Sequence, residues 1–185
     1  MRIFFAVKPS LDGISAIEKI IARLSKTRAD IRWVRKENIH ITIKFLGETE
    51  EDILRLIKED LKEKISSRKK FLFNLSGIGF FPDAFAPRVI WMGVSAGSEE
   101  FSGLARLIDE RLCSLINPEM EIQKFVPHLT LGRFKSRKGK DELMPLIHNL
   151  NIKIPVSQCE KVLLMKSVLT PRGPEYEEIA NFELG

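Results

Sequence analysis

Two short motifs in the chain repeat the same pair of chemically active residue types. The sequence contains three histidines, and two of them have a threonine two positions later, as His40 with Thr42 and His128 with Thr130. Only five threonines occur in 185 residues, so two such pairs exceed what chance would place. Side chains two positions apart in a β-strand point to the same face. Each motif therefore predicts an imidazole and a hydroxyl side by side on a strand.

Paired imidazoles and hydroxyls suit an in-line displacement at phosphorus. A single imidazole cannot efficiently take a proton from the attacking oxygen and also protonate the departing oxygen on the far side, whereas two facing imidazoles can. The ordinary pKa of histidine, about 6.5, makes both protonation states accessible near neutral pH. The threonine hydroxyls would donate hydrogen bonds to the non-bridging phosphate oxygens. The motifs therefore predict phosphoryl transfer with acid and base roles for His40 and His128.

A structural role and metal binding are the competing uses of these histidines. A single histidine of this kind is most often a partly buried structural residue, but two pairs at equivalent places favour function. No Asp, Glu or Cys lies at ligand spacing beside either motif, and two histidines alone rarely hold a catalytic zinc ion. We therefore expect no metal and no other cofactor. The polar neighbours of His148 indicate a surface residue without a role.

Two basic residues near the motifs are weaker candidates for binding substrate. Arg133 could hold a phosphate through its guanidinium, although strict alternation from His128 places it on the opposite face unless the strand bulges or ends. Lys44 shares the expected face of His40 and could line the same groove. An ordinary ion pair for Arg133 and solvent exposure for Lys44 are equally consistent with the sequence.

Further basic and aromatic residues are candidates for contacts with RNA. A basic run that follows the second motif could track an RNA backbone or form a solvated loop: Arg133, Lys135, Arg137, Lys138 and Lys140. Phe80, Phe81 and Phe85 could stack on bases, although packing beneath their loop is the favoured interpretation. Trp33 and Trp91 lie in apolar, strand-like contexts and are expected in the core.

The elements that must position these motifs occur in a repeated order. Apolar periodicity predicts strand, helix, strand with the first motif, helix and strand over residues 2–7, 14–24, 38–46, 53–65 and 71–75. The same order recurs over residues 88–94, 98–116, 125–134, 141–150 and 152–156. From Arg2 to His40 is 38 positions and from Arg88 to His128 is 40, which supports two related lobes.

Local signals add detail to this arrangement. Ser10 is expected to cap the first helix, and Thr49 followed by Asp52 resembles a capping box before the second. Residues 77–87, rich in Gly, Pro and Phe, predict a loop. Two last strands are expected at 161–169 and 176–182, joined by a turn at 171–174.

Alternation in the first motif strand assigns its residues to two faces. His40, Thr42 and Lys44 share one face, and Ile41, Ile43 and Phe45 share the face expected to enter the core. Combined with the repeated order, this pattern predicts an α+β fold of two lobes. Each lobe would have an antiparallel sheet with helices outside, and a groove would lie between the lobes.

Composition and charge limit the class of protein. A length of 185 residues, 44% hydrophobic, predicts one domain over residues 1–185, built of two intertwined lobes. The net charge of +5 favours anionic partners. Neither a signal peptide nor a membrane span is evident, so we expect a cytoplasmic protein, with Cys113 and Cys159 reduced. We also expect a monomer.

Four segments carry a resemblance to a known family. They are RWVRKENIHITIKFLGE (32–48), FPDAFAPRVIWMGV (81–94), FVPHLTLGRFK (125–135) and SVLTPRGPEYE (167–177). The chain resembles, over essentially its whole length, the bacterial and archaeal RNA 2′,3′-cyclic phosphodiesterases of the two-histidine (2H) phosphoesterase superfamily, formerly called 2′-5′ RNA ligases. The tetrads beginning at His40 and His128 match the HxTx motifs of that family.

The resemblance implies a fold, a reaction and residue roles. It implies a bilobal fold with pseudo-twofold symmetry and metal-independent opening of a terminal 2′,3′-cyclic phosphate, on RNA 3′ ends or cyclic nucleotides, to a 2′-phosphate. Carried over to this sequence, His128 would activate water, His40 would protonate the departing 3′ oxygen, and Thr42 and Thr130 would hold the phosphate. The alternatives are a 2′-5′ RNA ligase that joins cyclic-phosphate and 5′-hydroxyl ends, and a non-catalytic module that binds RNA ends.

Overall fold

The protein has a mixed α+β fold, as the sequence predicts. The computed structural model describes residues 1–116, 125–171 and 173–185, which contain four α-helices and nine strands. The helices are α1 (Leu11–Leu24), α2 (Glu51–Ser66), α3 (Ser98–Ile116) and α4 (Lys140–His148). The strands are β1 (Arg2–Val7), β2 (Ile31–Trp33), β3 (Ile41–Glu48), β4 (Phe71–Phe81), β5 (Val89–Ala96), β6 (His128–Phe134), β7 (Ser157–Cys159), β8 (Lys161–Thr170) and β9 (Gly173–Glu183).

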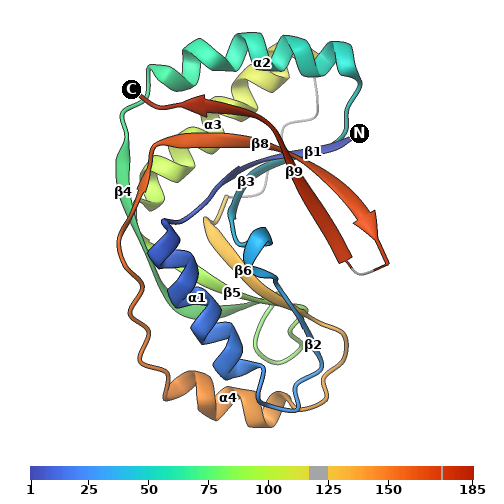
Figure 1. The fold of residues 1–185 in the computed structure, drawn as a ribbon, viewed down its shortest axis with the longest axis vertical. Helices are drawn as coiled ribbons and strands as arrows, with labels where there is room; N and C mark the ends of the chain where they lie inside the picture. The colour runs from blue at the N-terminus through green and yellow to red at the C-terminus, as the bar shows by residue number, and fades with distance from the viewer. Residues whose placement is uncertain (117–124, 172) are drawn as a thin grey trace.

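All nine strands join one curled antiparallel sheet rather than two separate sheets. Eight of them lie in the order β7-β4-β5-β6-β3-β1-β8-β9, and β2 pairs with β6. The strands with the two motifs, β3 and β6, meet in the middle of this order, where Ile41 is opposite Leu129. The helices lie at the two ends of the molecule, α2 and α3 at one end and α1 and α4 at the other (Figure 1). The two expected sheets are therefore halves of one sheet, joined at the motif strands.

The two halves of the sheet exchange a strand. β4 follows the first motif strand and α2 in the chain, yet it pairs with β5 in the second half. β8 follows the second motif strand and α4, yet it pairs with β1 in the first half. Each half thus needs a strand from the other half of the sequence, which places the two motifs side by side.

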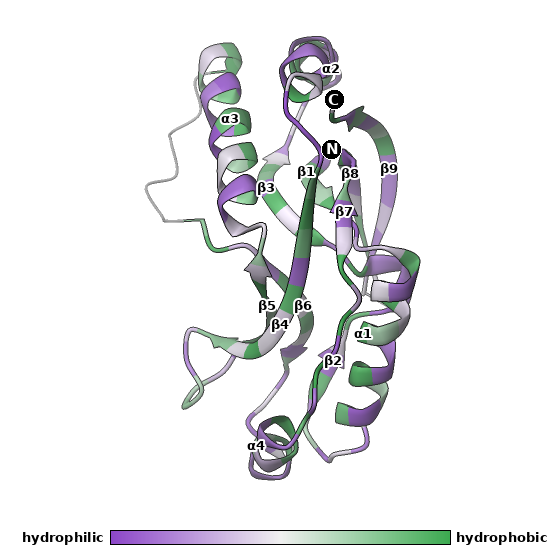
Figure 2. Ribbon diagram, turned by 90° about the vertical axis from the view of Figure 1, so that its left-hand side faces the viewer, coloured by the Kyte–Doolittle hydropathy of each residue, from purple (hydrophilic) through white to green (hydrophobic). Residues whose placement is uncertain are grey.

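Burial of the apolar residues explains why these elements form. All of β1 except Arg2 is buried, as expected for a central strand with both faces covered. In α1, the Oγ of Ser10 accepts a hydrogen bond from the Gly13 amide at 3.1 Å, which confirms Ser10 as the N-cap. Green and purple residues alternate along α1 and α3 in Figure 2, consistent with helices that are buried on one face. No helix in the described ranges has the length and hydrophobicity required to cross a membrane.

Three local predictions are wrong for identifiable reasons. β4 continues to Phe81, through much of the predicted loop, because Gly77, with φ of 68°, sits at a register shift that lets the strand bend and continue. Residues 152–156 are not a strand, since Pro155 has no N–H to donate, and the short strand β7 follows instead. The N-cap of α2 is Glu50 rather than Thr49, whose hydroxyl donates to the Gly47 carbonyl at 3.4 Å.

The second lobe helices and last strands follow the sequence prediction closely. Helix α3 spans the predicted 98–116, and α4 covers most of 141–150. β8 and β9 correspond to the predicted last pair, with β9 beginning three residues earlier than expected. Of the predicted turn at 171–174, residue 172 lies outside the described residues.

Candidate active site

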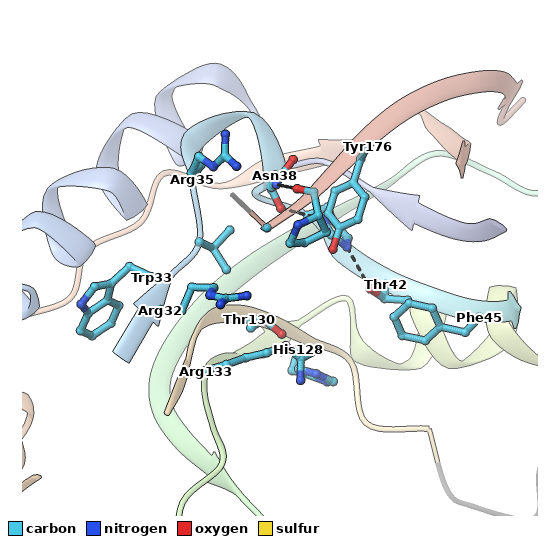
Figure 3. A pocket seen from close by; sticks show the side chains of 14 residues that line it. Arg32, Trp33, Arg35, Asn38, Thr42, Phe45, His128, Thr130, Arg133 and Tyr176 are labelled. Carbon is cyan, nitrogen blue, oxygen red and sulfur yellow. Dashed lines mark hydrogen bonds between the residues drawn. The ribbon is translucent and has the colours of Figure 1, made fainter. Parts of the chain in front are cut away.

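The side chains of both motifs line one cavity. His40 lies immediately before β3, and His128 is the first residue of β6. With Thr42 and Thr130 they line a pocket of about 190 Å³, shown from close by in Figure 3. The central β3–β6 pairing explains why two motifs far apart in the sequence share a cavity.

Both imidazoles are held through the same ring nitrogen. His40 Nδ1 lies 2.7 Å from the Asn38 carbonyl oxygen, and His128 Nδ1 lies 2.8 Å from the Val126 carbonyl oxygen. A carbonyl oxygen only accepts hydrogen bonds, so each Nδ1 must carry a proton and donate it. The Nε2 atom of each neutral ring is then unprotonated and able to act as a base.

Aromatic rings flank each imidazole. The His40 ring lies 5.1 Å from the Phe4 ring and 5.3 Å from the Tyr176 ring, centroid to centroid. The His128 ring lies 4.9 Å from Phe81 and 5.9 Å from Trp91. These rings contribute to the burial of each imidazole.

This burial shifts the protonation of both histidines. It lowers the pKa of His40 to about 4, a shift that the Asn38 hydrogen bond opposes and the charges of Lys8 and His128 reinforce. Burial also lowers the pKa of His128, and the charge of Arg133 adds to that effect. In the free protein at neutral pH, both rings are therefore predominantly neutral.

A β-bulge reverses the predicted positions of Lys44 and Phe45. Ala6 is opposite Thr42 and Phe5 is opposite Lys44, so Ile43 is an extra residue on β3. The Lys44 ammonium points to helix α3, where it pairs with Asp109 at 2.8 Å, and Lys44 is not among the pocket residues. The prediction that Lys44 lines the groove is wrong.

The same bulge moves Phe45 out of its predicted core position. Its side chain is 65% exposed and lines the pocket beside Thr42, as Figure 3 shows. The Phe45 ring contacts Phe4, with centroids 5.6 Å apart, and so continues the aromatic wall next to His40.

A second bulge brings Arg133 to the pocket. Ile90 is opposite Gly132 and Trp91 is opposite Thr130, which leaves Leu131 as the extra residue on β6. Both Leu131 and Gly132 are buried, and Arg133 therefore returns to the face of His128 and Thr130 and lines the cavity. The sequence analysis required such a bulge, or the end of the strand, for Arg133 to reach the phosphate.

The pocket also contains residues that the sequence analysis did not identify. Arg32 is directly opposite Arg133 across the β2–β6 pair, and both line the cavity together with Arg35. None of the described lining residues is acidic. Like charges directly opposite one another are unfavourable unless an anion lies between them, so the cavity is built to receive negative charge.

Tyr176 and Asn38 are the other missed residues. The Asn38 side-chain amide donates to the Pro174 carbonyl at 2.8 Å, which ties the turn before β3 to the start of β9. Tyr176 follows on β9, and its ring is nearly perpendicular to the His40 ring.

The remaining candidates lie in varied surroundings. Trp33 is partly buried and packs against the core, as predicted, while it also lines the pocket. Trp91 is partly buried and contacts His128, so its predicted core position is wrong. Phe80 packs against the core as expected, whereas Phe85 is exposed. His148 is exposed, as predicted.

Within the described residues, neither a disulfide nor a cluster of metal ligands is found. Cys113 and Cys159 are not joined in a disulfide. Across residues 1–116, 125–171 and 173–185, no three His, Cys, Asp or Glu side chains gather as metal ligands would.

Two imidazoles and several guanidiniums around one cavity are suited to the binding and cleavage of a phosphate ester. The LigT-like phosphoesterase family matches residues 7–91. A Methanothermobacter thermautotrophicus protein named RNA 2′,3′-cyclic phosphodiesterase is 33% identical over 100% of this chain and 99% of its own. A Methanocaldococcus jannaschii protein of the same name is 36% identical over 97% of this chain and 98% of its own.

A solved structure shares the fold over the whole chain. The crystal structure of a Thermus thermophilus protein superposes with a TM-score of 0.80 and 26% identity, over 99% of this chain and 97% of that one. The chain therefore belongs to the LigT-like phosphoesterase family, and it is a phosphodiesterase.

Proposed function

We propose that the protein hydrolyses the terminal 2′,3′-cyclic phosphate of RNA to a 2′-phosphate by two-histidine acid–base catalysis without a metal. The names of the relatives support the substrate. One observation carries the mechanism: both imidazoles donate from Nδ1 to backbone carbonyls, at 2.7 and 2.8 Å, beside a single cavity. Each Nε2 is thereby kept for proton transfer.

The reaction balances with one proton accepted and one donated. The Nε2 atom of His128 removes a proton from water as the water oxygen forms a bond to phosphorus. The bond from phosphorus to the 3′ oxygen breaks, and His40 Nε2–H protonates that oxygen. The product carries a 2′-phosphate and a 3′-hydroxyl. Proton exchange with solvent then returns both imidazoles to their starting states.

Binding of the anionic substrate causes His40 to take up from solvent the proton that it later donates. A pKa of about 4 leaves the His40 ring neutral in the free protein at neutral pH. A phosphodiester anion in the cavity favours the charged imidazolium and so raises the pKa of His40. His40 is therefore expected to become protonated when substrate binds.

The hydroxyl and guanidinium groups of the cavity stabilise the charge that shifts in the transition state. Thr42 and Thr130 donate to the non-bridging oxygens, and Arg133 supplies a fixed positive charge at the same face. Proton transfer and charge stabilisation thus both come from side chains of this chain, and for this reason we propose a metal-independent reaction.

Replacement of each histidine tests the proposal. We expect His40→Ala and His128→Ala each to lower the hydrolysis rate of a 2′,3′-cyclic nucleotide in EDTA by about 1,000-fold or more, since each removes one proton transfer and one ordered imidazole. His148→Ala, a matched change at an exposed histidine, serves as the control. Near wild-type turnover in both site variants, or loss of wild-type activity in EDTA, would overturn the proposal.

A further inference from the structure

The loop between β4 and β5 holds an aromatic ring out into solvent. The Phe85 side chain is 77% exposed. Asp83 Oδ1 accepts hydrogen bonds from the Phe85 and Ala86 amides at 2.8 and 2.9 Å. The Lys140 ammonium donates to the Ala84 and Phe85 carbonyls at 3.2 and 3.1 Å. The loop is thus pinned in a conformation that presents the ring instead of burying it.

Two cationic side chains, those of Arg137 and Lys140, lie close to the Phe85 ring. The Arg137 guanidinium carbon lies 5.7 Å and the Lys140 ammonium 5.6 Å from the centroid of Phe85. Both cations lie over the ring. An exposed aromatic ring together with basic side chains is the combination that single-strand binding sites use, because bases stack on aromatic rings while cations contact phosphates.

We propose that Phe85, Arg137 and Lys140, here called the Phe85 platform, bind the nucleotides that adjoin the reacting end of a single-stranded RNA. This inference rests on the proposed function, because it takes RNA as the substrate. It makes oligoribonucleotides, rather than free cyclic nucleotides, the preferred substrates of the site.

The platform loop leads into a strand that borders the catalytic pocket. Val89, the first residue of β5, is opposite Arg133, which lines the pocket. Phe85 precedes Val89 by four residues, so their Cα atoms lie at most about 14 Å apart. The Phe134 amide also donates to the Arg88 carbonyl at 3.0 Å, which joins the platform loop to the end of β6.

Charge favours this side of the pocket for an RNA chain. Residues 133–140 contain five basic residues and no acidic residue. On the β9 side of the pocket, Glu175, Glu177 and Glu178 are exposed. Because RNA carries a negative charge at each phosphate, the chain is steered toward the platform and away from β9.

A comparison of substrate lengths tests the platform. kcat/KM would be measured for a 2′,3′-cyclic mononucleotide and for a short single-stranded oligoribonucleotide with the same cyclic end. We expect Phe85→Ala to lower kcat/KM by about tenfold or more for the oligonucleotide and to leave the mononucleotide value unchanged. Leu72→Ala, which truncates another exposed apolar side chain, is the matched control.

A charge variant adds a second readout. We expect Arg137→Gln to reduce the salt dependence of kcat/KM for the oligonucleotide, because one phosphate contact is lost. Arg106→Gln, at an exposed arginine of α3, should leave it unchanged. Equal effects of Phe85→Ala on both substrates, or no effect on the oligonucleotide, would overturn the inference.

Direct binding separates this inference from the proposed function. The Kd of a fluorescent single-stranded oligoribonucleotide with a 3′-phosphate can be measured by anisotropy, without any reaction. Weaker binding by Phe85→Ala supports the platform even if the wild type hydrolyses neither substrate, a result that would overturn only the proposed function. Unchanged binding together with normal hydrolysis would overturn only the platform.

Discussion

The Nε2 atom of His40 lies 3.0 Å from the Oγ1 atom of Thr42. Since His40 Nδ1 donates to the Asn38 carbonyl, the neutral Nε2 is an acceptor and the Thr42 hydroxyl donates to it. The hydroxyl therefore orients the ring in the free protein, and it must turn its hydrogen to phosphate when His40 becomes protonated. The Thr42 hydroxyl thus orients His40 in the free protein and donates to the phosphate when substrate is bound.

This relationship predicts a large effect from loss of the Thr42 hydroxyl. We expect Thr42→Val to lower kcat/KM for a 2′,3′-cyclic nucleotide by about 100-fold, because a donor to the developing charge is lost. Thr42→Ser keeps the hydroxyl and should remain within about tenfold of the wild type. Equal rates for the valine and serine variants would show that the hydroxyl does not act on the reaction.

The two depressed histidine pKa values predict the pH dependence. The reaction needs one neutral and one charged imidazole, so kcat/KM should be bell-shaped in pH. Both pKa values lie below the ordinary 6.5 in the free protein, and the optimum of kcat/KM should therefore lie on the acid side of 6.5. Bound phosphodiester anion raises both pKa values, which moves the optimum of kcat to higher pH. A kcat/KM that only rises with pH would contradict paired acid and base roles.

Lys44 and Arg133 offer a matched pair of charge deletions. Arg133→Met should lower kcat/KM by about tenfold or more with little change in stability, because its guanidinium lines the pocket. Lys44→Met should leave kcat/KM within about threefold while lowering the free energy of unfolding by about 1 to 2 kcal/mol, since Asp109 loses its partner. Steady-state kinetics and urea unfolding of both variants distinguish these effects. The opposite pattern would mean that Lys44, not Arg133, contacts substrate.

Local patterns in the sequence were sufficient to find the catalytic candidates. His40, Thr42, His128 and Thr130 were predicted from type and spacing, and the structure brings all four to one cavity. The alternation of strand faces did not predict the positions of the residues that follow these motifs, because alternation assumes strand pairing without bulges. The extra residues Ile43 and Leu131 exchange the faces of the residues that follow. These bulges depend on pairing with other strands, so no local pattern reports them.

Long-range contacts set the other limit on prediction. The helices and most strands follow from apolar periodicity, which is a local property. The exchange of β4 and β8 between the halves of the sheet depends on contacts between distant segments. Tyr176 was missed for the same reason, because only the β8–β9 hairpin brings its ring to His40.

The most direct test of the central claim separates the acid from the base. A 3′-deoxynucleoside 2′-(4-nitrophenyl phosphate) places 4-nitrophenolate, which leaves without protonation, in the position of the 3′ oxygen. Rates of the wild type, His40→Ala and His128→Ala would be compared on this ester and on the cyclic phosphate. We predict that His40→Ala recovers by about 100-fold or more on the ester, relative to its loss on the cyclic phosphate, while His128→Ala remains impaired on both. Equal losses for His40→Ala on the two substrates would contradict its role as the acid.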